Sequence, residues 1–244
     1  MQTRFYIPED TPTLAYAREY LLRRGMPIVS EGRYASHVLL GMAPKTLPED
    51  IPEDAVVMGG KLQALAGARK VDFLEDPYFL AENAKITAHC ALSELLPRLN
   101  SILPECPVLV IGWGRIGKLL LQKLRGLNAA ACLMSRNPEA RSLAAAMGYE
   151  ALAPDCGSAL MSSFDAVINT APAQVLGELS ALRDGCILLE LASAPGGLDP
   201  QAAQDGGMRY ISAPGLPGKY APVSAARLIY GAVTNIFKEC GICE

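Results

Sequence analysis

The sequence has few aromatic residues, few charged residues and very little histidine. Phe, Trp and Tyr make up 6% of its 244 residues, Asp, Glu, Lys and Arg make up 19%, and the two histidines are His37 and His89. The formal net charge of -3 argues against a protein that coats nucleic acid, because such a protein needs a basic stripe to neutralise phosphates. The longest apolar runs, such as residues 108–111, fall far short of the about 18 residues that a membrane span requires. We therefore expect neither a nucleic acid nor a membrane as a partner.

The start of the chain lacks the apolar core of a signal peptide, because Pro8, Glu9 and Asp10 interrupt it at once. We therefore expect a cytoplasmic protein. The seven cysteines are an odd number at scattered positions, so no disulfide framework is implied. Cys240 and Cys243 have a spacing typical of metal or redox sites, but no second pair completes four ligands. We expect no metal site and a plain terminal tail.

Apolar residues make up 50% of the chain, which is enough for a sizeable core. In residues 104–222, short apolar runs alternate with amphipathic stretches, and this pattern predicts a doubly wound parallel α/β sheet, the Rossmann fold. Residues 1–87 carry shorter strand-like runs and predict a smaller N-terminal α/β domain. Between the two we expect a linking helix over residues 88–103 that is either kinked at Pro97 or begins nearer to it. By analogy with two-domain dehydrogenases, the helix expected at 223–238 joins the first domain.

The strongest motif is the glycine-rich turn GWGRIG at residues 112–117. It follows an apolar strand-like run directly and opens an amphipathic helix, the context that a dinucleotide-binding turn requires. Gly112 permits the tight turn, Gly114 lets a pyrophosphate approach the backbone, and Gly117 lets the helix pack closely on the sheet. Arg115 and Ile116 stand at the helix N-terminus, where free N–H groups attract phosphate. The motif predicts a dinucleotide site.

The end of the second strand indicates which dinucleotide binds. NAD sites usually carry Asp or Glu at this point, whereas this sequence has Ser135, Arg136 and Asn137. No carboxylate is present to repel a 2′-phosphate, Arg136 can pair with it, and Ser135 can donate a hydrogen bond. The alternative is that Arg136 is a solvated surface residue. We predict NADP in preference to NAD.

Three segments rich in glycine and proline follow later strands, at the sheet edge where ligands of such folds bind. From them we expect cofactor contacts by Thr170, Ala171, Pro172 and Ser193. The expected substrate contacts are Asn83, Lys85, Thr87, Asn169, Gly215, Gly218 and Lys219. Glu190 is expected to cap or pair inside the sheet end. The catalytic group is left open between Lys219 and His89, with a solvated lysine and a structural histidine as the alternatives.

Four segments are shared with a known family, at residues 108–117, 165–172, 188–197 and above all 213–222, which reads APGLPGKYAP. Through them residues 83–237 resemble the family of the dipicolinate synthase A subunit. The resemblance implies NADP-dependent oxidation of dihydrodipicolinate, or of its hydroxylated precursor, to dipicolinate, the calcium chelator of spores, and so a role in sporulation. It implies a small dicarboxylate as substrate and, as partner, a flavoprotein-like B subunit. A homo-oligomer is left open.

The scarcity of histidine is compatible with that reaction. Loss of a hydride and a proton creates an aromatic ring, so positioning and anion recognition matter more than a strong base. Two alternatives remain. The shortened first domain is compatible with an NADP-binding subunit or sensor without catalysis. The D-2-hydroxyacid dehydrogenases share the fold and the turn but use a histidine late in the dinucleotide domain, and no histidine follows His89.

Overall fold

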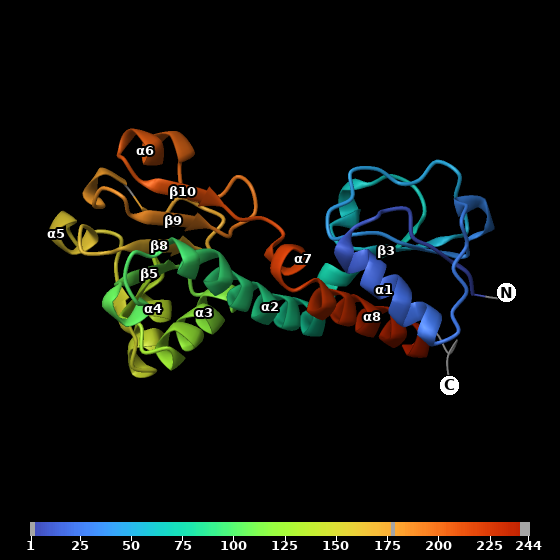
Figure 1. Ribbon diagram of the computed structural model, residues 1–244, viewed down its shortest axis with the longest axis horizontal. Coiled ribbons are helices and arrows are strands. Elements are labelled where there is room, and N and C mark those ends of the chain that lie inside the picture. The colour runs from blue at the N-terminus through green and yellow to red at the C-terminus, as the bar shows by residue number, and fades with distance from the viewer. Residues whose placement is uncertain (1–2, 177–178, 240–244) are drawn as a thin grey trace. The chain divides into compact units, whose positions relative to one another are not determined.

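A computed structural model describes residues 3–176 and 179–239 (Figure 1). The chain divides into two compact units, one made of Met1–Ile86 with Pro217–Glu244 and the other of Thr87–Leu216. Each unit contains an all-parallel sheet with helices, and the six-stranded sheet belongs to the second. The predicted fold class, a doubly wound parallel sheet with a smaller N-terminal α/β domain, is confirmed. We retain the limits 1–87, 88–103 and 104–222 as a proposal for the folding domains.

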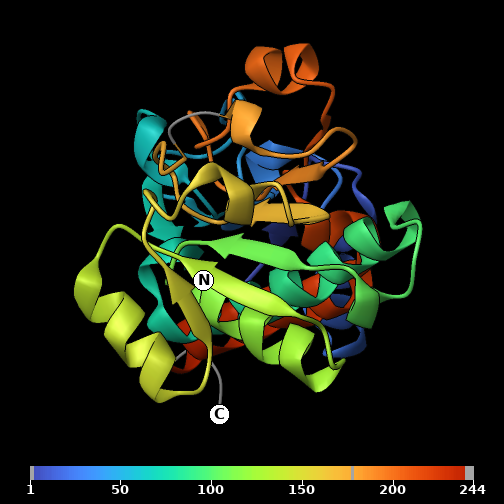
Figure 2. The same ribbon diagram turned by 90° about the vertical axis from the view of Figure 1, so that its left-hand side faces the viewer.

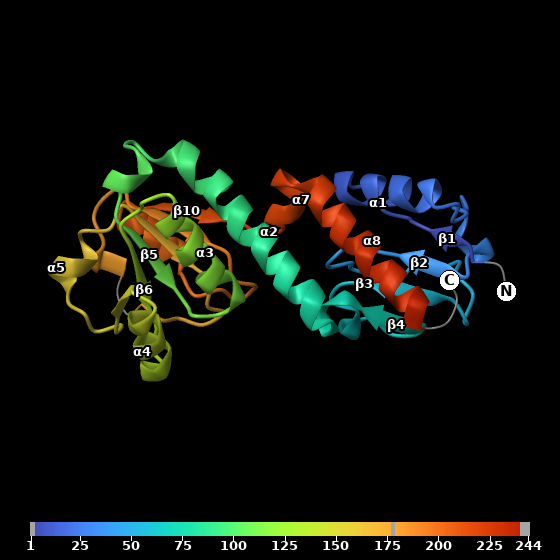
Figure 3. The same ribbon diagram turned by 90° about the horizontal axis from the view of Figure 1, so that it is seen from below.

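The first unit is a four-stranded sheet in the order β1-β2-β3-β4. Its strands are β1 (Phe5–Tyr6), β2 (His37–Leu39), β3 (Val56–Gly59) and β4 (Arg69–Asp72), and its two long helices are α1 (Pro12–Arg23) and α8 (Pro222–Glu239). Figures 1 and 3 show α1 and α8 side by side along the sheet. Because side chains alternate along a strand, Leu39 packs in the core with α1 and α8, whereas Val38 packs in a second cluster with Val57.

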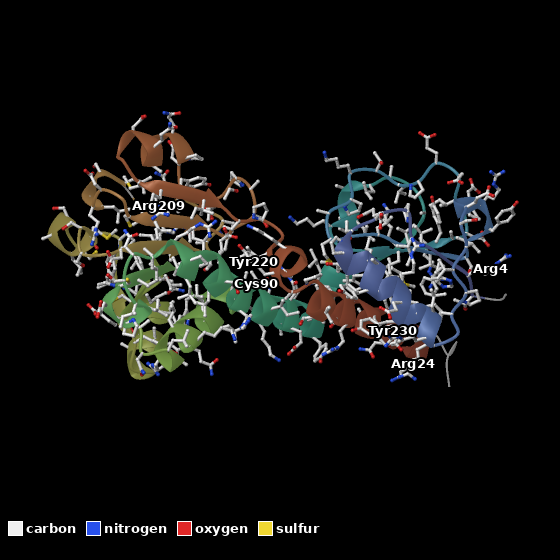
Figure 4. All side chains as sticks on the ribbon, viewed as in Figure 1. Arg4, Arg24, Cys90, Arg209, Tyr220 and Tyr230 are labelled. Atoms are coloured by element: carbon white, nitrogen blue, oxygen red, sulfur yellow. The ribbon has the colours of Figure 1, made fainter. Side chains whose placement is uncertain are left out.

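Aromatic side chains fill the contact between these two helices and the sheet. Tyr230 of α8, labelled in Figure 4, packs on Tyr20 of α1 with 5.8 Å between ring centroids. Phe237 lies 5.7 Å from Phe5 in β1. The last helix of the chain therefore completes the core of the first unit.

His37 in β2 is a half-buried histidine with aromatic neighbours. Its ring centroid lies 4.8 Å from that of Phe237, and its Nδ1 is 2.9 Å from Ser36 Oγ. Burial, and secondarily the charge of Arg69, lower the pKa of His37 from its ordinary 6.5. The unfolded chain therefore binds the proton better than the folded one.

We expect the free energy of unfolding to change little near pH 7.5 and to fall as the pH drops through about 6.5, where the unfolded histidine takes up its proton. Chemical unfolding followed by circular dichroism between these values checks this. His37→Gln should remove the dependence in this range, while His89→Gln, which changes the other and exposed histidine, should retain it. An unchanged slope in His37→Gln would assign the dependence to another group.

The second unit is a six-stranded parallel sheet in the order β10-β9-β8-β5-β6-β7, with three strands on each side of the switch point between β5 and β8. Figure 2, in which this unit faces the viewer, shows the twist of its strands. Its strands are β5 (Val108–Ile111), β6 (Ala131–Met134), β7 (Glu150–Leu152), β8 (Ala166–Asn169), β9 (Ile187–Glu190) and β10 (Arg209–Ser212), and its helices include α3 (Arg115–Gly126), α4 (Pro138–Ala146), α5 (Ser158–Met161) and α6 (Pro200–Asp205). Strands β5, β8 and β9 are buried throughout, as expected for parallel strands covered on both faces.

The helix predicted over residues 88–103 is displaced in the structure. Helix α2 (Pro77–Leu95) begins earlier, with proline as its first residue, and a 3-10 turn at Leu96–Arg98 follows it. Pro97 lacks the N–H that a helix interior requires, so the chain leaves the α-helix there instead of kinking. A short helix α7 (Leu216–Tyr220) precedes α8. In the described ranges, no helix has both the length and the apolar character needed to cross a bilayer.

Candidate dinucleotide-binding site

The turn between β5 and α3 is packed so closely that two of its glycines cannot carry a side chain. Gly112 has a φ of +102°, and a Cβ there would lie 2.7 Å from Thr170 Oγ1. A Cβ on Gly117 would lie 2.1 Å from the carbonyl oxygen of Gly112. Thr170 holds the other side of the turn, because its Oγ1 donates to the carbonyl oxygen of Ile111 at 2.8 Å. The turn is thus fixed between the ends of β5 and β8.

Gly114 has the opposite environment. It is the N-cap residue of α3 in an extended conformation, and a Cβ built on it would have no atom within 4 Å. The space beside it borders the first N–H groups of α3, which have no intrahelical acceptor and carry a partial positive charge. Tight packing at Gly112 and Gly117 combined with open space at Gly114 fits a pyrophosphate group approaching the backbone.

A hollow of about 390 Å³ continues from the turn to the end of β6, and it is lined by Gly112, Met134, Ser135, Arg136, Asn137, Ala171 and Val175. Ser135 is 9% exposed, while the Arg136 side chain is exposed at the rim. The Asn137 side chain caps α4 by accepting from the Glu139 N–H at 2.9 Å. The hollow thus combines a hydroxyl, a guanidinium and backbone groups, with no carboxylate in its lining.

Arg141 supports this loop and was not identified from the sequence. It is partly buried in α4, and its Nη1 donates to the carbonyl oxygens of Ser135 at 2.7 Å and Arg136 at 3.0 Å. These bonds turn two carbonyl groups toward α4. The one sequence signal was its position six residues after Ser135, one turn into a helix that begins with proline.

Two polar side chains at the ends of β8 and β9 form a buried cluster. Asn169 is 1% exposed and Glu190 is 4% exposed. Asn169 Nδ2 donates to Glu190 Oε1 at 2.8 Å and to the carbonyl oxygen of Ala171 at 2.9 Å. Because these two bonds use both amide hydrogens of Asn169, the structure places this residue inside the sheet end. Its predicted substrate contact stays a prediction that would require one of the bonds to be replaced.

Trp113, the one tryptophan of the sequence, lies inside the turn. Its ring makes an edge contact with Tyr149 at 6.1 Å between centroids, and Lys118 Nζ lies 5.3 Å from its ring centroid. The indole Nε1 is buried without a hydrogen-bond partner. Fluorescence of this protein is therefore a local probe of the turn, because tryptophan emission comes from this position alone.

The other predicted residues fall on separate elements. Lys85 and His89 are four residues apart on α2 and both exposed, with Lys85 Nζ paired to Glu82 Oε2 at 3.1 Å. Asn83 and Thr87, also four apart, lie on a less exposed face of the same helix. Asn83 and Lys85 belong to the first unit, whereas Thr87 and His89 belong to the second. The candidates on α2 therefore lie on two faces of the helix, Lys85 and His89 on the exposed face and Asn83 and Thr87 on the other.

The remaining candidates lie in loops and in α7. Pro172 and Ser193 are exposed in the loops after β8 and β9. Gly215 has a φ of +67°, and Gly218 and Lys219 are exposed within α7, where Lys219 Nζ lies 4.8 Å from the Tyr220 ring centroid. Their roles stay predictions.

Two cysteines of the second unit, Cys132 and Cys186, are unsuited to nucleophilic chemistry. Burial, followed by a hydrogen bond to Glu150, raises the pKa of the Cys132 thiol to about 12, and burial raises that of Cys186 to about 12. Thiols of this kind are poor nucleophiles near neutral pH. Across residues 3–176 and 179–239, no group of three or more His, Cys, Asp or Glu side chains is arranged to hold a metal ion. Cys240 and Cys243 lie outside the described residues.

Comparison with known proteins gives a specific similarity. No family model matches the chain. Over 134 residues it is 30% identical to the dipicolinate synthase A subunit of Bacillus subtilis (strain 168), covering 54% of this chain and 45% of that protein. The crystal structure of dipicolinate synthase A chain from Bacillus subtilis superposes with a TM-score of 0.80 at 17% identity, covering 98% of this chain and 97% of that one. The resemblance to the A subunit of dipicolinate synthase is confirmed.

The fold extends to further structures. The dipicolinate synthase A subunit from Bacillus halodurans gives a TM-score of 0.78 at 20% identity, covering 97% of this chain and 98% of that one. A transhydrogenase from Sinorhizobium meliloti gives 0.74 at 13% identity, with 97% and 92% covered. At these identities the structures show a shared fold. The sequence match itself spans less than half the length of the Bacillus subtilis relative, 45% of it.

Proposed function

We propose that this protein is an NADP-dependent oxidoreductase that converts dihydrodipicolinate, or its hydroxylated precursor, to dipicolinate as the A subunit of a dipicolinate synthase. The proposal joins the similarity to that protein with a site suited to a dinucleotide. One observation carries it: the turn with open space at Gly114 also lines, through Gly112, a hollow that contains Ser135 and Arg136 and no carboxylate.

Each part of the site has a role in holding the cofactor. The N–H groups at the start of α3 receive the pyrophosphate, and Ser135 and Arg136 receive the ribose 2′-phosphate. When bound, the oxidised nicotinamide would supply a hydride acceptor for dihydrodipicolinate, whose ring would also release one proton as it becomes aromatic; the hydroxylated precursor would first have to lose one water. Lys219 and the glycine-rich loops would hold the carboxylates of the substrate, which reduces the demand for a strong base.

The direct test uses the purified protein with NADP and freshly generated dihydrodipicolinate. Absorbance is followed for reduced cofactor and for dipicolinate, with and without a flavoprotein-like partner. Joint appearance of both products supports the proposal, and dependence on the partner would show that the B subunit completes the site. Tight NADPH binding without turnover in either mixture would favour a non-catalytic cofactor-binding subunit or sensor.

The D-2-hydroxyacid dehydrogenase alternative needs a proton-carrying histidine late in the dinucleotide domain. His89, the last histidine of the chain, is exposed on α2, so we do not propose this reaction. We keep the cytoplasmic location, the role in sporulation, the flavoprotein-like partner and a possible homo-oligomer as parts of the proposal.

Cofactor preference should depend on Arg136. Replacing it with glutamine removes a charge-assisted contact to the 2′-phosphate, which is worth about 1.5–3 kcal/mol and thus roughly 10- to 100-fold in affinity. We expect the NADPH dissociation constant of Arg136→Gln to rise by that factor and the NADH constant to change little, as measured by quenching of Trp113 emission. Lys123→Gln, in the last turn of α3, is the charge-matched control. Equal loss of both cofactors in Arg136→Gln would contradict the assignment.

A further inference from the structure

Glu190 is a buried carboxylate whose hydrogen bonds are made to uncharged donors. Its Oε1 accepts from Asn169 Nδ2 at 2.8 Å and from the Ala192 N–H at 2.9 Å. Its Oε2 accepts from the N–H groups of Gly197 at 2.9 Å and Leu198 at 3.0 Å. No ion pair to Glu190 occurs in the described part of the chain. The charge is thus balanced by the dipoles of amide groups.

These bonds close the loop after β9 on itself. Ala192 lies at one end of the loop, Gly197 and Leu198 lie at the other, and both ends meet at the same carboxylate. Gly197 also approaches the neighbouring loop closely, because a Cβ on it would lie 2.5 Å from the carbonyl oxygen of Ala173 and 2.7 Å from Asn169 Nδ2. Between the two ends, Ser193 is exposed.

Glu190 also connects the loops that follow three adjacent strands. Asn169 ties it to the β8 loop through the Ala171 carbonyl. The main-chain carbonyl of Glu190 accepts from the Ala213 N–H at 3.0 Å, at the start of the loop after β10. Ligands of a doubly wound sheet lie outside the carboxyl ends of the strands, which is where these three loops stand.

We propose that Glu190 is a positioning residue for the nicotinamide half of the cofactor, acting through the 191–198 loop. This inference rests on the proposed function for the identity of the cofactor. The adenosine half belongs to the Gly112–Gly117 turn and the Ser135–Asn137 hollow, on the β5 and β6 side of the switch point. Glu190 instead controls the loops after β8, β9 and β10. The two halves of one ligand therefore depend on separate groups.

The charge of the carboxylate is essential because every partner of its side chain is a donor. In Glu190→Gln the amide nitrogen would face either the Ala192 N–H or the N–H groups of Gly197 and Leu198, whereas Asn169 Nδ2 reaches both positions, at 2.8 and 3.0 Å. At least one backbone N–H would lose its acceptor in either orientation, although the side chain keeps its shape. The loop would lose its closure at one end without a cavity forming.

Binding of NADPH and of 2′,5′-ADP, which is the adenosine half alone, separates the two roles. For Glu190→Gln we expect a rise of about tenfold in the NADPH dissociation constant, the size of one lost charge-assisted hydrogen bond. The constant for 2′,5′-ADP should stay within about twofold, and the fluorescence anisotropy of bound NADPH should fall because its ring is less restrained. The amides of Ala192, Gly197 and Leu198 should exchange hydrogen faster without any ligand.

Asp72→Asn is the matched control. Asp72 is a second buried carboxylate, 7% exposed, that accepts from the N–H groups of Lys61, Leu62 and Leu74 in the first unit. This variant should lower the melting temperature, yet leave the ratio of the two dissociation constants unchanged. If Glu190→Gln fails to fold, Gly197→Ala retains the carboxylate and displaces the same loop, with the same expected change in the ratio.

The outcomes separate this inference from the proposed reaction. If Glu190→Gln raises the dissociation constants of NADPH and 2′,5′-ADP equally, or raises neither, the positioning role is overturned even if dipicolinate is formed. If Glu190→Gln selectively weakens NADPH binding while the wild-type protein forms no dipicolinate, the positioning role stands and the proposed reaction is overturned. Absence of NADPH and NADH binding to the wild-type protein overturns the inference.

Discussion

Gly114→Ala is expected to fold with wild-type stability and to bind NADPH about 100-fold more weakly, a loss equivalent to one or two charge-assisted hydrogen bonds. The new methyl group meets no protein atom within 4 Å, so the unliganded protein has no reason to change. The same methyl group fills the space through which the pyrophosphate reaches the first turn of α3. Titration of Trp113 emission gives the affinity, and thermal unfolding gives the stability.

Two other glycines of the same segment complete the experiment. Gly117→Ala would place its Cβ 2.1 Å from the Gly112 carbonyl oxygen, so it should lose both affinity and stability, the latter by about 3 kcal/mol for a forced main-chain shift. Gly126→Ala, in the last turn of α3 with open space around it, should bind NADPH normally. Wild-type affinity in Gly114→Ala would show that the phosphates do not use this turn.

The turn could be predicted from the sequence because its determinants are local. Strand β5, the three glycines and the start of α3 are contiguous, and each has a residue pattern that its conformation requires. The same holds for Ser135 and Arg136, which follow β6 directly. Short-range chemistry therefore predicted the glycine-rich turn and the position of Ser135 and Arg136 beside it without knowledge of the packing.

The buried cluster at Glu190 could be anticipated only in outline. A carboxylate at the end of an apolar strand must be capped or paired, and that much follows from the cost of burial. Its partner Asn169 comes from a neighbouring strand, and the donors Gly197 and Leu198 come from the return of the loop. These contacts depend on strand order and loop closure, which no local pattern encodes.

The helix predicted over residues 88–103 was wrong in its bounds for a different reason. The leucines after residue 92 have helical spacing, but they extend across Pro97 into 3-10 turns. The helical spacing of apolar residues continues beyond the helix because Leu103 is buried although it lies in a turn. Tertiary packing can bury residues of any local conformation. As a result, the faces on which Asn83, Lys85 and Thr87 lie became known only from the helix that contains all three.

Lys219→Met is expected to raise the KM for the dicarboxylate substrate by about 10- to 100-fold, because one charge-assisted contact of about 1.5–3 kcal/mol is lost. Methionine retains an aliphatic stem to pack beside Tyr220, whose ring centroid lies 4.8 Å from Lys219 Nζ, so α7 should stay folded. The NADPH dissociation constant should not change, since the proposed cofactor contacts lie in the second unit. Steady-state kinetics with varied dihydrodipicolinate provides the measurement.

Two further variants separate the effect of the Lys219 charge on KM from the effect of its side-chain shape. Lys219→Arg keeps a cation and should recover part of the affinity, but not all of it, because the guanidinium is planar and placed differently. Lys45→Met removes another exposed lysine and should leave KM unchanged, which corrects for the lower net charge of the protein. If Lys219→Met changes KM no more than Lys45→Met does, the carboxylates are held instead by the N–H groups of the glycine-rich loops. The Glu190 variant would then affect substrate affinity as well as the nicotinamide.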